Sequence, residues 1–309
     1  MLGQYLFMPV KDWMEDTTVL YEMGKLTNNR EVILWNKGEN FPKRQLYAGG
    51  SKHMKYLVQR VASKKKGMKV CVGSNYLDFK ALNPPLLKYV FQSEWWSWKN
   101  VIWNTHIGHP DIYKGKNMIW DIDSEGEPMV AFEQAEKLCA YLSGEGYEPM
   151  LVFSGSKGFH VWLNVEDSRQ LVGKSFADFL PFDCEKKGTA WQLSQVYNDV
   201  VVEVFETATG DSFRLADKSP IQRQGIISCP YSLHWTTGQI VWPMDAKNLD
   251  SLRALPVDAQ PVDIAKALHT QDNGQLWETD IEFNGGKLYF PPCHTVSNRG
   301  MPVWKGLDG

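Results

Sequence analysis

The residues with the clearest chemical potential are acidic side chains at the end of an expected strand, Asn117–Ile122. The period of a strand places Asp121 and Asp123 on one face, while Trp120 and Ile122 point to the opposite face and into a core. Two carboxylates at this spacing oppose each other's ionisation, and a divalent cation relieves that repulsion. Because magnesium and manganese bind carboxylate and phosphate oxygens, the pair indicates a metal site for a phosphorylated substrate.

A polar turn joins two further expected strands, Met150–Phe153 and Phe159–Leu163. The turn, Ser154–Gly158, combines two glycines, two serines and Lys157, and His160 follows it on the second strand. Glycines allow close backbone approach, and hydroxyl, ammonium and amide donors together suit a phosphate group. The structural alternative is a glycine-rich hairpin turn beside a buried histidine.

A third group of polar residues surrounds His234, between the expected strands Gly225–Ser228 and Gln239–Trp242. Asp211 and Asp217 lie upstream, and either could complete a site of three carboxylates. A single histidine at this position would more often be structural. Three such groups at strand ends favour metal-dependent transfer of a phosphorylated group.

The composition limits the classes of protein that the chain can represent. Its 309 residues are 43% hydrophobic and 22% charged, with a net charge of −3, so nucleic-acid binding would need a local basic patch. The five cysteines have no CxxC spacing, which argues against a disulfide framework or zinc knuckle and suits a reducing cytoplasm. The sequence has no signal peptide and no run long enough to cross a bilayer, so we expect a soluble cytoplasmic protein without a membrane partner.

The local basic patch is expected on a helix that begins at Ser51. Apolar residues at helical spacing, from Met54 to Val61, form its buried side. The opposite side is either an ordinary solvated face or a surface that binds the phosphate backbone of a DNA template. The candidate template-binding residues are Lys52, Lys55, Arg60, Lys64 and Lys65.

The remaining pattern predicts strands that alternate with helices. Strands are expected at 32–35 and 69–72, and a helix from Pro128 to Gly144 or Gly146. The segment Trp191–Phe205 predicts a helix, although its run of three valines would also suit a strand. A single helix near Val262–Leu268 follows Pro243, and a Gly/Pro-rich tail completes the chain. This order predicts an α/β fold with a mixed sheet. We expect a core over 1–250 and a C-terminal helix with an irregular tail over 251–309.

In their order along the chain, three segments resemble the archaeo-eukaryotic primase (prim-pol) superfamily. They are Asp121–Asp123, Ser154–Trp162 and Ser232–Gly238, and the likeness extends over roughly Asn29 to Asp245. The closest likeness is to the small catalytic subunit of archaeal and eukaryotic DNA primases. The resemblance implies an α+β prim-pol fold, in which an RRM-like mixed catalytic sheet lies beside a second α/β subdomain and the active site lies in the cleft between them.

The resemblance also implies roles for individual residues. The catalytic acids, which would hold two Mg²⁺ or Mn²⁺ ions, are Asp121, Asp123 and Asp217. The residues that would contact the phosphates of the nucleotide are Ser154, Ser156, Lys157, His160 and His234.

The chain departs from the family pattern in three places. The third acid is one residue closer to the His234 motif than usual, which leaves Asp211 as an alternative to Asp217. Ser228 stands where the family has a basic residue, and Arg223 could substitute for it. The cysteine-rich zinc element is absent, so no structural zinc is expected. The reduced architecture would suit a viral or plasmid-encoded relative.

The predicted function is synthesis of short primers on single-stranded DNA during replication, by two-metal nucleotidyl transfer from NTPs or dNTPs. The alternatives are a primer-extending or end-filling repair polymerase of the same superfamily, and a non-catalytic nucleic-acid-binding subunit. The sequence contains no readable motif for the choice of sugar. It also leaves open whether a large primase subunit or a replicative helicase is a partner.

Overall fold

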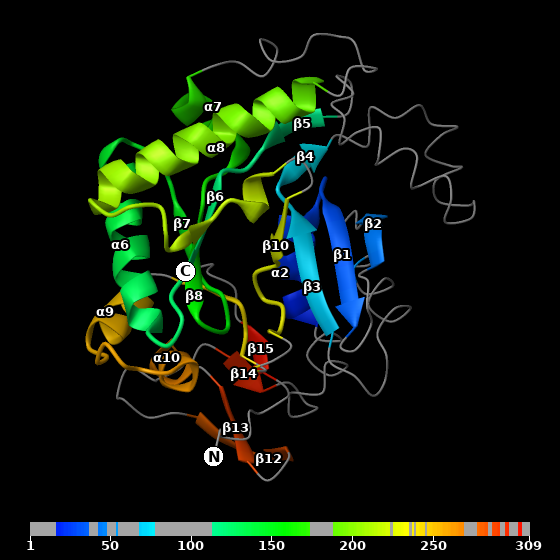
Figure 1. Cartoon of the computed structure of the whole chain (residues 1–309). Helices are drawn as coiled ribbons and strands as arrows, with labels where there is room; N and C mark the ends of the chain where they lie inside the picture. Colours follow the sequence, from blue (N-terminus) through cyan, green and yellow to red (C-terminus); the bar gives the residue numbers. More distant parts are fainter. Residues whose placement is uncertain are drawn as a thin grey trace, which may run out of the picture.

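The computed structural model centres on two antiparallel sheets (Figure 1). One has the strand order β11-β7-β8-β6-β9, and the other has the order β10-β3-β1-β2. The structure describes residues 17–36, 43–47, 54, 68–77, 113–173, 188–222, 225–234, 237, 239–244, 246–268, 277–283, 286–290, 294–296 and 302–304.

The five-stranded sheet has the topology of a β-α-β-β-α-β unit. Strands β6 and β7 both pair with β8, which lies between them, and β9 pairs with the other edge of β6. The resulting order, β7-β8-β6-β9, is the ferredoxin-like arrangement that RRM domains share. The elements are β6 (Ile119–Asp123), α6 (Pro128–Gly144), β7 (Met150–Phe153), β8 (Gly158–Trp162), α8 (Gly188–Thr209) and β9 (Ala216–Asp217), with β11 (Trp242–Pro243) added next to β7.

The predicted α+β class is confirmed, but the prediction of a mixed sheet was wrong for the described strands. Every pairing between named strands in the two main sheets is antiparallel. Strands β6 and β7 do run parallel to each other, as the intervening helix α6 requires. Because β8 lies between them, they form no parallel pair.

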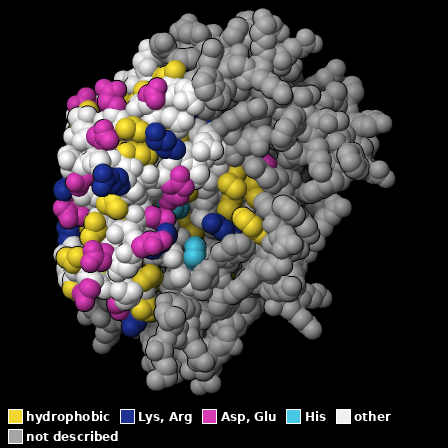
Figure 2. All heavy atoms as spheres, in the orientation of Figure 1, with side chains coloured by type: hydrophobic (Ala, Val, Ile, Leu, Met, Phe, Trp, Pro, Cys, Tyr) yellow, Lys and Arg dark blue, Asp and Glu magenta, His cyan; other side chains and the backbone are white. Residues whose placement is uncertain are grey.

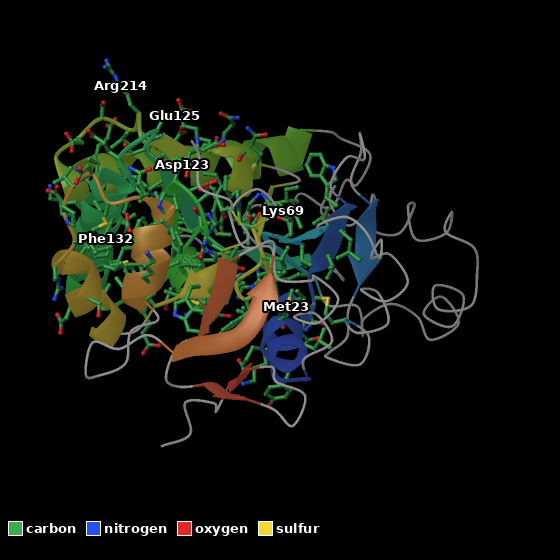
Figure 3. All side chains as sticks on the ribbon, turned by 90° about the horizontal axis from the view of Figure 1, so that it is seen from below. Met23, Lys69, Asp123, Glu125, Phe132 and Arg214 are labelled. Carbon is green, nitrogen blue, oxygen red and sulfur yellow. The ribbon has the colours of Figure 1, made fainter. Side chains whose placement is uncertain are left out.

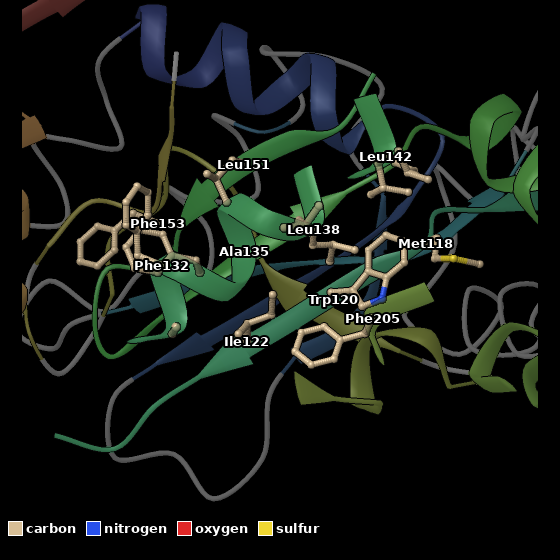
Figure 4. Packing of buried hydrophobic residues seen from close by; sticks show 14 of the residues in the cluster. Met118, Trp120, Ile122, Phe132, Ala135, Leu138, Leu142, Leu151, Phe153 and Phe205 are labelled. Carbon is tan, nitrogen blue, oxygen red and sulfur yellow. The ribbon is translucent and has the colours of Figure 1, made fainter. Parts of the chain in front are cut away.

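Helices α6 and α8 cover one face of the five-stranded sheet (Figure 1). Helix α6 starts with Pro128 in its first turn and ends at Gly144, as predicted, and α8 confirms the helical alternative for 191–205. Figure 4 shows the tight packing of their apolar side chains over the sheet. The buried cluster includes Trp120, Ile122, Phe132, Ala135, Leu138, Leu142, Leu151, Phe153, Phe159 and Phe205.

The opposite face of this sheet turns toward the four-stranded sheet. Apolar residues of that face, Ile119, Val152 and Trp162, belong to one buried cluster with Val32 and Val70 of the second sheet. Helix α2 contributes to the same cluster through buried apolar side chains. The elements of this half are α2 (Thr17–Thr27), β1 (Glu31–Asn36), β2 (Lys43–Tyr47), β3 (Met68–Gly73) and β10 (Ile226–Ser228).

The C-terminal part is more regular than the sequence predicts. Two helices, rather than one, follow Pro243, and Ile264 and Leu268 of the second pack into the core beneath α6. Strand pairs occupy positions where an irregular tail is predicted. These elements are α9 (Ala246–Arg253), α10 (Pro261–Leu268), β12 (Trp277–Phe283), β13 (Gly286–Phe290), β14 (His294–Val296) and β15 (Pro302–Trp304).

Short elements complete the described chain. They are β4 (Asn75–Leu77), β5 (Tyr113–Lys116), α7 (Val165–Val172) and the 3-10 turn η3 (Ser219–Ile221). Of the predicted basic helix, only Met54 is described, and it is helical and buried. None of the helices within the described residues has the length and apolar character needed to cross a lipid bilayer.

Candidate active site

A cavity of about 230 Å³ opens between the two sheets. Figure 2 shows this face of the molecule, where His, Lys or Arg, and hydrophobic side chains line a hollow with acidic side chains along its edge. The five-stranded sheet and its turns contribute Asp121, Asp123, Ser154, Ser156, Lys157 and His160. The four-stranded sheet and its loops contribute Trp35, Lys69, Cys71, Ile226, Ile227, Ser228 and His234, and η3 contributes Ser219.

Strand pairing brings the acidic side chains to one face. Asp121 and Asp123 alternate with buried residues along β6, and both remain partly exposed. Asp217 on β9 is the direct cross-strand partner of Asp121. Directly paired residues point to the same face of an antiparallel sheet, with Cβ atoms roughly 5 Å apart. The Asp217 carboxylate accepts hydrogen bonds from the backbone N–H and the hydroxyl of Ser219, at 2.9 and 2.8 Å.

The alternative third acid, Asp211, lies elsewhere. It follows α8, and its Oδ2 accepts a hydrogen bond of 2.7 Å from Nε2 of Gln134 on α6. Asp211 therefore belongs to the helix-covered side of the sheet, whereas Asp217 lies on the strand next to β6. Asp217 is thus the nearer of the two to Asp121 along the sheet, although it is not among the residues that line the cavity.

Two cationic or polar groups contact the paired acids. His160 is the cross-strand partner of Asp121, and its Nε2 lies 3.3 Å from Oδ1 of that residue. Nζ of Lys157 lies 3.4 Å from both Oδ2 of Asp123 and Oε1 of Glu125. Figure 3 shows Asp123 and Glu125 on the same side of the molecule. The two side chains that the sequence predicts to contact phosphate therefore both contact acids of the site.

The electrostatics of the two β6 acids differ. Burial would raise the pKa of Asp121, but the charge and hydrogen bond of His160, with Lys69 and Lys157, hold it below its usual value. Burial and then the charge of Asp121 raise the pKa of Asp123, despite its contact with Lys157. The pair thus carries the like-charge repulsion that its spacing predicts, concentrated on Asp123.

The Ser154–Gly158 turn is built by its first serine. The buried Oγ of Ser154 accepts the backbone N–H groups of Ser156 and Gly158, at 3.3 and 3.2 Å. The backbone amides of Ser156 and Gly158, which the sequence offers as donors to a phosphate, thus donate to Ser154. The hydroxyl proton of Ser154 is not used in these bonds.

Two glycines of the turn permit close contacts with other parts of the site. A Cβ at Gly158 would overlap Oδ1 of Asp123, its partner on β6, and the carbonyl oxygen of Ile122. A Cβ at Gly155 would lie 2.8 Å from Cβ of His234, and the φ of Gly155 is +82°. These glycines let the turn approach the acids on one side and the histidine on the other.

Hydrogen bonds orient His234 within the cavity. The backbone N–H of Thr237 donates to its Nδ1 at 3.4 Å, while the Thr237 hydroxyl donates to the carbonyl oxygen of Gly155. Burial, followed by the charges of Lys69 and His160, lowers the pKa of His234 to about 4. His234 is therefore neutral at physiological pH. Nδ1 also lies 3.1 Å from the hydroxyl oxygen of Thr237, and the tautomer of the imidazole sets which of these two atoms donates.

The donor set fits a divalent cation that is shared with a substrate. Magnesium is usually bound by one or two carboxylates together with substrate phosphates, rather than by an all-protein cage. Asp121 and Asp123 supply two such carboxylates, and burial together with the charge of Asp121 raises the pKa of Asp123. Within the described residues, no three His, Cys, Asp or Glu side chains already enclose a metal-sized space.

Two residues of the site were missed by sequence reasoning. Lys69 faces the cavity from β3, and its signal was a single charge in an otherwise apolar strand. Ser219 orients Asp217 through two hydrogen bonds, and the spacing of an Asp and a Ser two residues later is typical of such turns. Several predicted residues lie outside the described part of the chain, namely Arg223, Lys52, Lys55, Arg60, Lys64 and Lys65.

Among the comparisons with known proteins, the one with solved structures found matches. No family model matches the sequence, and no curated protein matches it. Among solved structures, the fold is similar to the polymerase domain from Mycobacterium tuberculosis ligase D in complex with DNA. The TM-score is 0.47 at 14% sequence identity, over 83% of this chain and 85% of that chain. The function of the present chain is therefore inferred from its own side chains.

Proposed function

We propose that this protein is a prim-pol nucleotidyltransferase, related most closely to the primase small subunit, that synthesises primers on single-stranded DNA. One observation carries this proposal. A single cavity places the carboxylates of β6 opposite the neutral His234 and the cationic Lys69. The cavity thus combines an acidic end that suits a metal ion with a donor-rich end that suits phosphate oxygens.

The residues of the cavity would have separate roles in nucleotidyl transfer. Asp121 and Asp123, with Asp217 across the strand pair, would hold Mg²⁺ or Mn²⁺. The chemistry supplied at these carboxylates by bound ions would be a lower pKa of the attacking 3′-hydroxyl and stabilisation of charge on the α-phosphate. His160 orients Asp121 through its 3.3 Å contact. The N–H of His234 would donate to the leaving pyrophosphate.

Lys157 and the serines of the turn would act on the same phosphates. Lys157 forms ion pairs with Asp123 and Glu125, each at 3.4 Å. Its flexible side chain is half-exposed, so it can exchange these acids for a phosphate when the substrate arrives. The Ser154 hydroxyl fixes the turn that presents Ser156 and Lys157.

The proposal extends to the partners and the place of action. The substrates would be NTPs or dNTPs and a single-stranded DNA template, and the protein would act with the replication machinery in the cytoplasm. A large primase subunit or a replicative helicase is a candidate partner. We also propose the catalytic core over 1–250, with 251–309 packed against it.

The test is synthesis by the purified protein on unprimed single-stranded DNA. Each set of NTPs or dNTPs would be supplied with Mg²⁺ or Mn²⁺, and Asp121→Ala would serve as the inactive control. We expect short products from the wild-type protein without a primer and none from the variant. Equal synthesis by Asp121→Ala would contradict the proposed site.

Two other outcomes would select an alternative function. Products that require an annealed primer would identify a primer-extending or end-filling polymerase. No product, together with no divalent-dependent binding of nucleotides, would identify a non-catalytic subunit that binds nucleic acid. Titration of Mg²⁺ or Mn²⁺ into the protein with each nucleotide provides that measurement.

A further inference from the structure

The four-stranded sheet carries a lysine on the wall of the cavity that faces the acids. Lys69 is on β3, and its cross-strand partner is Trp35 on β1, so both side chains share the face that lines the cavity. The next residue on β3, Val70, points to the other face of the strand and is fully buried in an apolar cluster with Val32. Figure 3 shows Lys69 on the side of the second sheet that is turned toward Asp123.

The position of Lys69 follows from the residues that share the cavity with it. Asp121 and Asp123 of the five-stranded sheet line the cavity, and so does His234 of the loop after β10. The charge of Lys69 also lowers the pKa of His234, as expected for a nearby cation. Lys69 therefore faces the same space as the acids and the histidine.

The ion pairs of the cavity leave Lys69 available to a ligand. Lys157, the other lysine that lines it within the described residues, already contacts Asp123 and Glu125. No carboxylate of the described residues forms an ion pair with Lys69. A half-buried ammonium group without a carboxylate partner is costly, and an anionic ligand would remove that cost.

We infer that Lys69 binds the phosphate chain of the incoming nucleotide from the four-stranded sheet, opposite Asp121 and Asp123. The inference rests on the proposed function and adds a residue to it. Lysine binds phosphate as a mobile point charge, which suits a group that must reach across a cleft. The second sheet is then part of the binding site rather than only a support for the first. Both sheets must be in place for the phosphate chain to be held.

The experiment measures binding by the full chain, with ATP and inorganic tripolyphosphate as probes, each with Mg²⁺, and with adenosine as the phosphate-free probe. Lys69→Met removes the charge and keeps the length of the side chain, and Lys69→Arg keeps the charge. Lys137→Met is the matched control, because Lys137 is exposed on α6 and pairs only with Glu133 at 2.8 Å among the described residues. Calorimetry gives the dissociation constants.

We expect Lys69→Met to weaken binding of ATP and tripolyphosphate by roughly 10- to 100-fold, as for loss of a hydrogen bond to a charged group. Binding of adenosine should not change. Lys69→Arg should stay within about threefold of the wild-type protein, and Lys137→Met should equal it. If the wild-type protein binds ATP and Lys69→Met binds it equally well, the inference is overturned and the proposed function stands. If the wild-type protein binds neither ATP nor tripolyphosphate, both are overturned.

A second measurement on the wild-type protein needs no variant to fold. Lysine acetylation by an amine-reactive reagent is followed by mass spectrometry with and without tripolyphosphate and Mg²⁺. We expect tripolyphosphate to protect Lys69 and to leave the modification of Lys137 unchanged. Equal modification of Lys69 in both conditions overturns the inference.

Discussion

On one face of β6, Trp120 and Ile122 pack beneath α6 and α8, and on the other face Asp121 and Asp123 look across a cavity at a second sheet. The two faces belong to the same five residues and the same hydrogen-bonded ladder. The helix-covered face contributes apolar burial, which is the main source of stability. The cavity face carries repelling carboxylates, which add little to stability and are suited to a charged ligand. A substitution on one face should therefore affect folding, and a substitution on the other should affect chemistry.

The largest expected effect is on the cavity face. Asp121→Asn should lower nucleotidyl transfer by about 10³-fold, because it removes a charged ligand at the point where transition-state charge develops. Its free energy of unfolding should change by less than about 1 kcal/mol, since the lost charge also relieves the repulsion of Asp123. Initial rates and urea denaturation measure the two quantities. Asp250→Asn, an exposed acid on α9, is the control that should affect neither.

The helix-covered face should show the reverse pattern. Trp120→Ala should lower the free energy of unfolding by about 3–5 kcal/mol, because it empties a fully buried site. It also removes the 2.9 Å hydrogen bond from Nε1 to the carbonyl oxygen of Val201 on α8. Urea denaturation gives the loss, and the activity per folded molecule should be retained. A large loss of activity with normal stability would contradict the assignment of folding to one face of β6 and chemistry to the other.

A third prediction concerns Gly158 on β8, the strand partner of Asp123 on β6. Gly158→Ala should reduce activity by roughly tenfold or more and stability by about 1–3 kcal/mol, because the new Cβ overlaps Oδ1 of Asp123 and the carbonyl oxygen of Ile122. Gly144→Ala is the matched control, since a Cβ there meets no atom within 4 Å. Rates and denaturation curves of the two variants should differ. Equal behaviour would mean that the close approach of β8 to Asp123 is not required.

The smallest expected effect concerns pH. The pKa of His234 is about 4 in the folded protein and 6.5 as its ordinary value, so the unfolded chain binds the proton more readily. The stability that depends on the neutral imidazole is fully present above pH 6.5. It is lost as the pH falls from 6.5 to about 4, by about 1 kcal/mol once the shift is discounted for solvent screening at this partly exposed position. His234→Gln should remove this part of the pH dependence. Denaturation curves of both proteins across that range test it, and parallel profiles would argue against the burial of His234.

Much of the sheet could be predicted because the pattern is local. The alternation around Asp121 predicts which side chains face the core, and Pro128 correctly predicts the start of α6. The strands 32–35 and 69–72 and the helix around 191–205 are likewise confirmed. Helix α9 was not predicted, because its sequence lacks a clear apolar period. The prediction of a mixed sheet was wrong, because sequence order does not show that β8 inserts between the parallel strands β6 and β7.

The candidate site could be predicted only in part. The motifs correctly bring Asp121, Asp123, His160 and His234 into one cavity, because each lies at a strand end. The choice between Asp211 and Asp217 depends on which of them pairs with β6, and that pairing joins residues far apart in the chain. The contact of Lys157 with Asp123 and Glu125 likewise depends on the folded turn.

The sequence by itself determined the order of acids, polar turn and histidine, because residue types and the period of a strand are local properties. Only the tertiary structure decided that a second sheet faces these groups and that Lys69 shares one cavity with Asp121 and His234. It also decided that Ser154 binds the amides of its own turn. The physical reason is that these relations depend on distances between segments separated by many residues, which packing and strand pairing set and the local pattern does not encode.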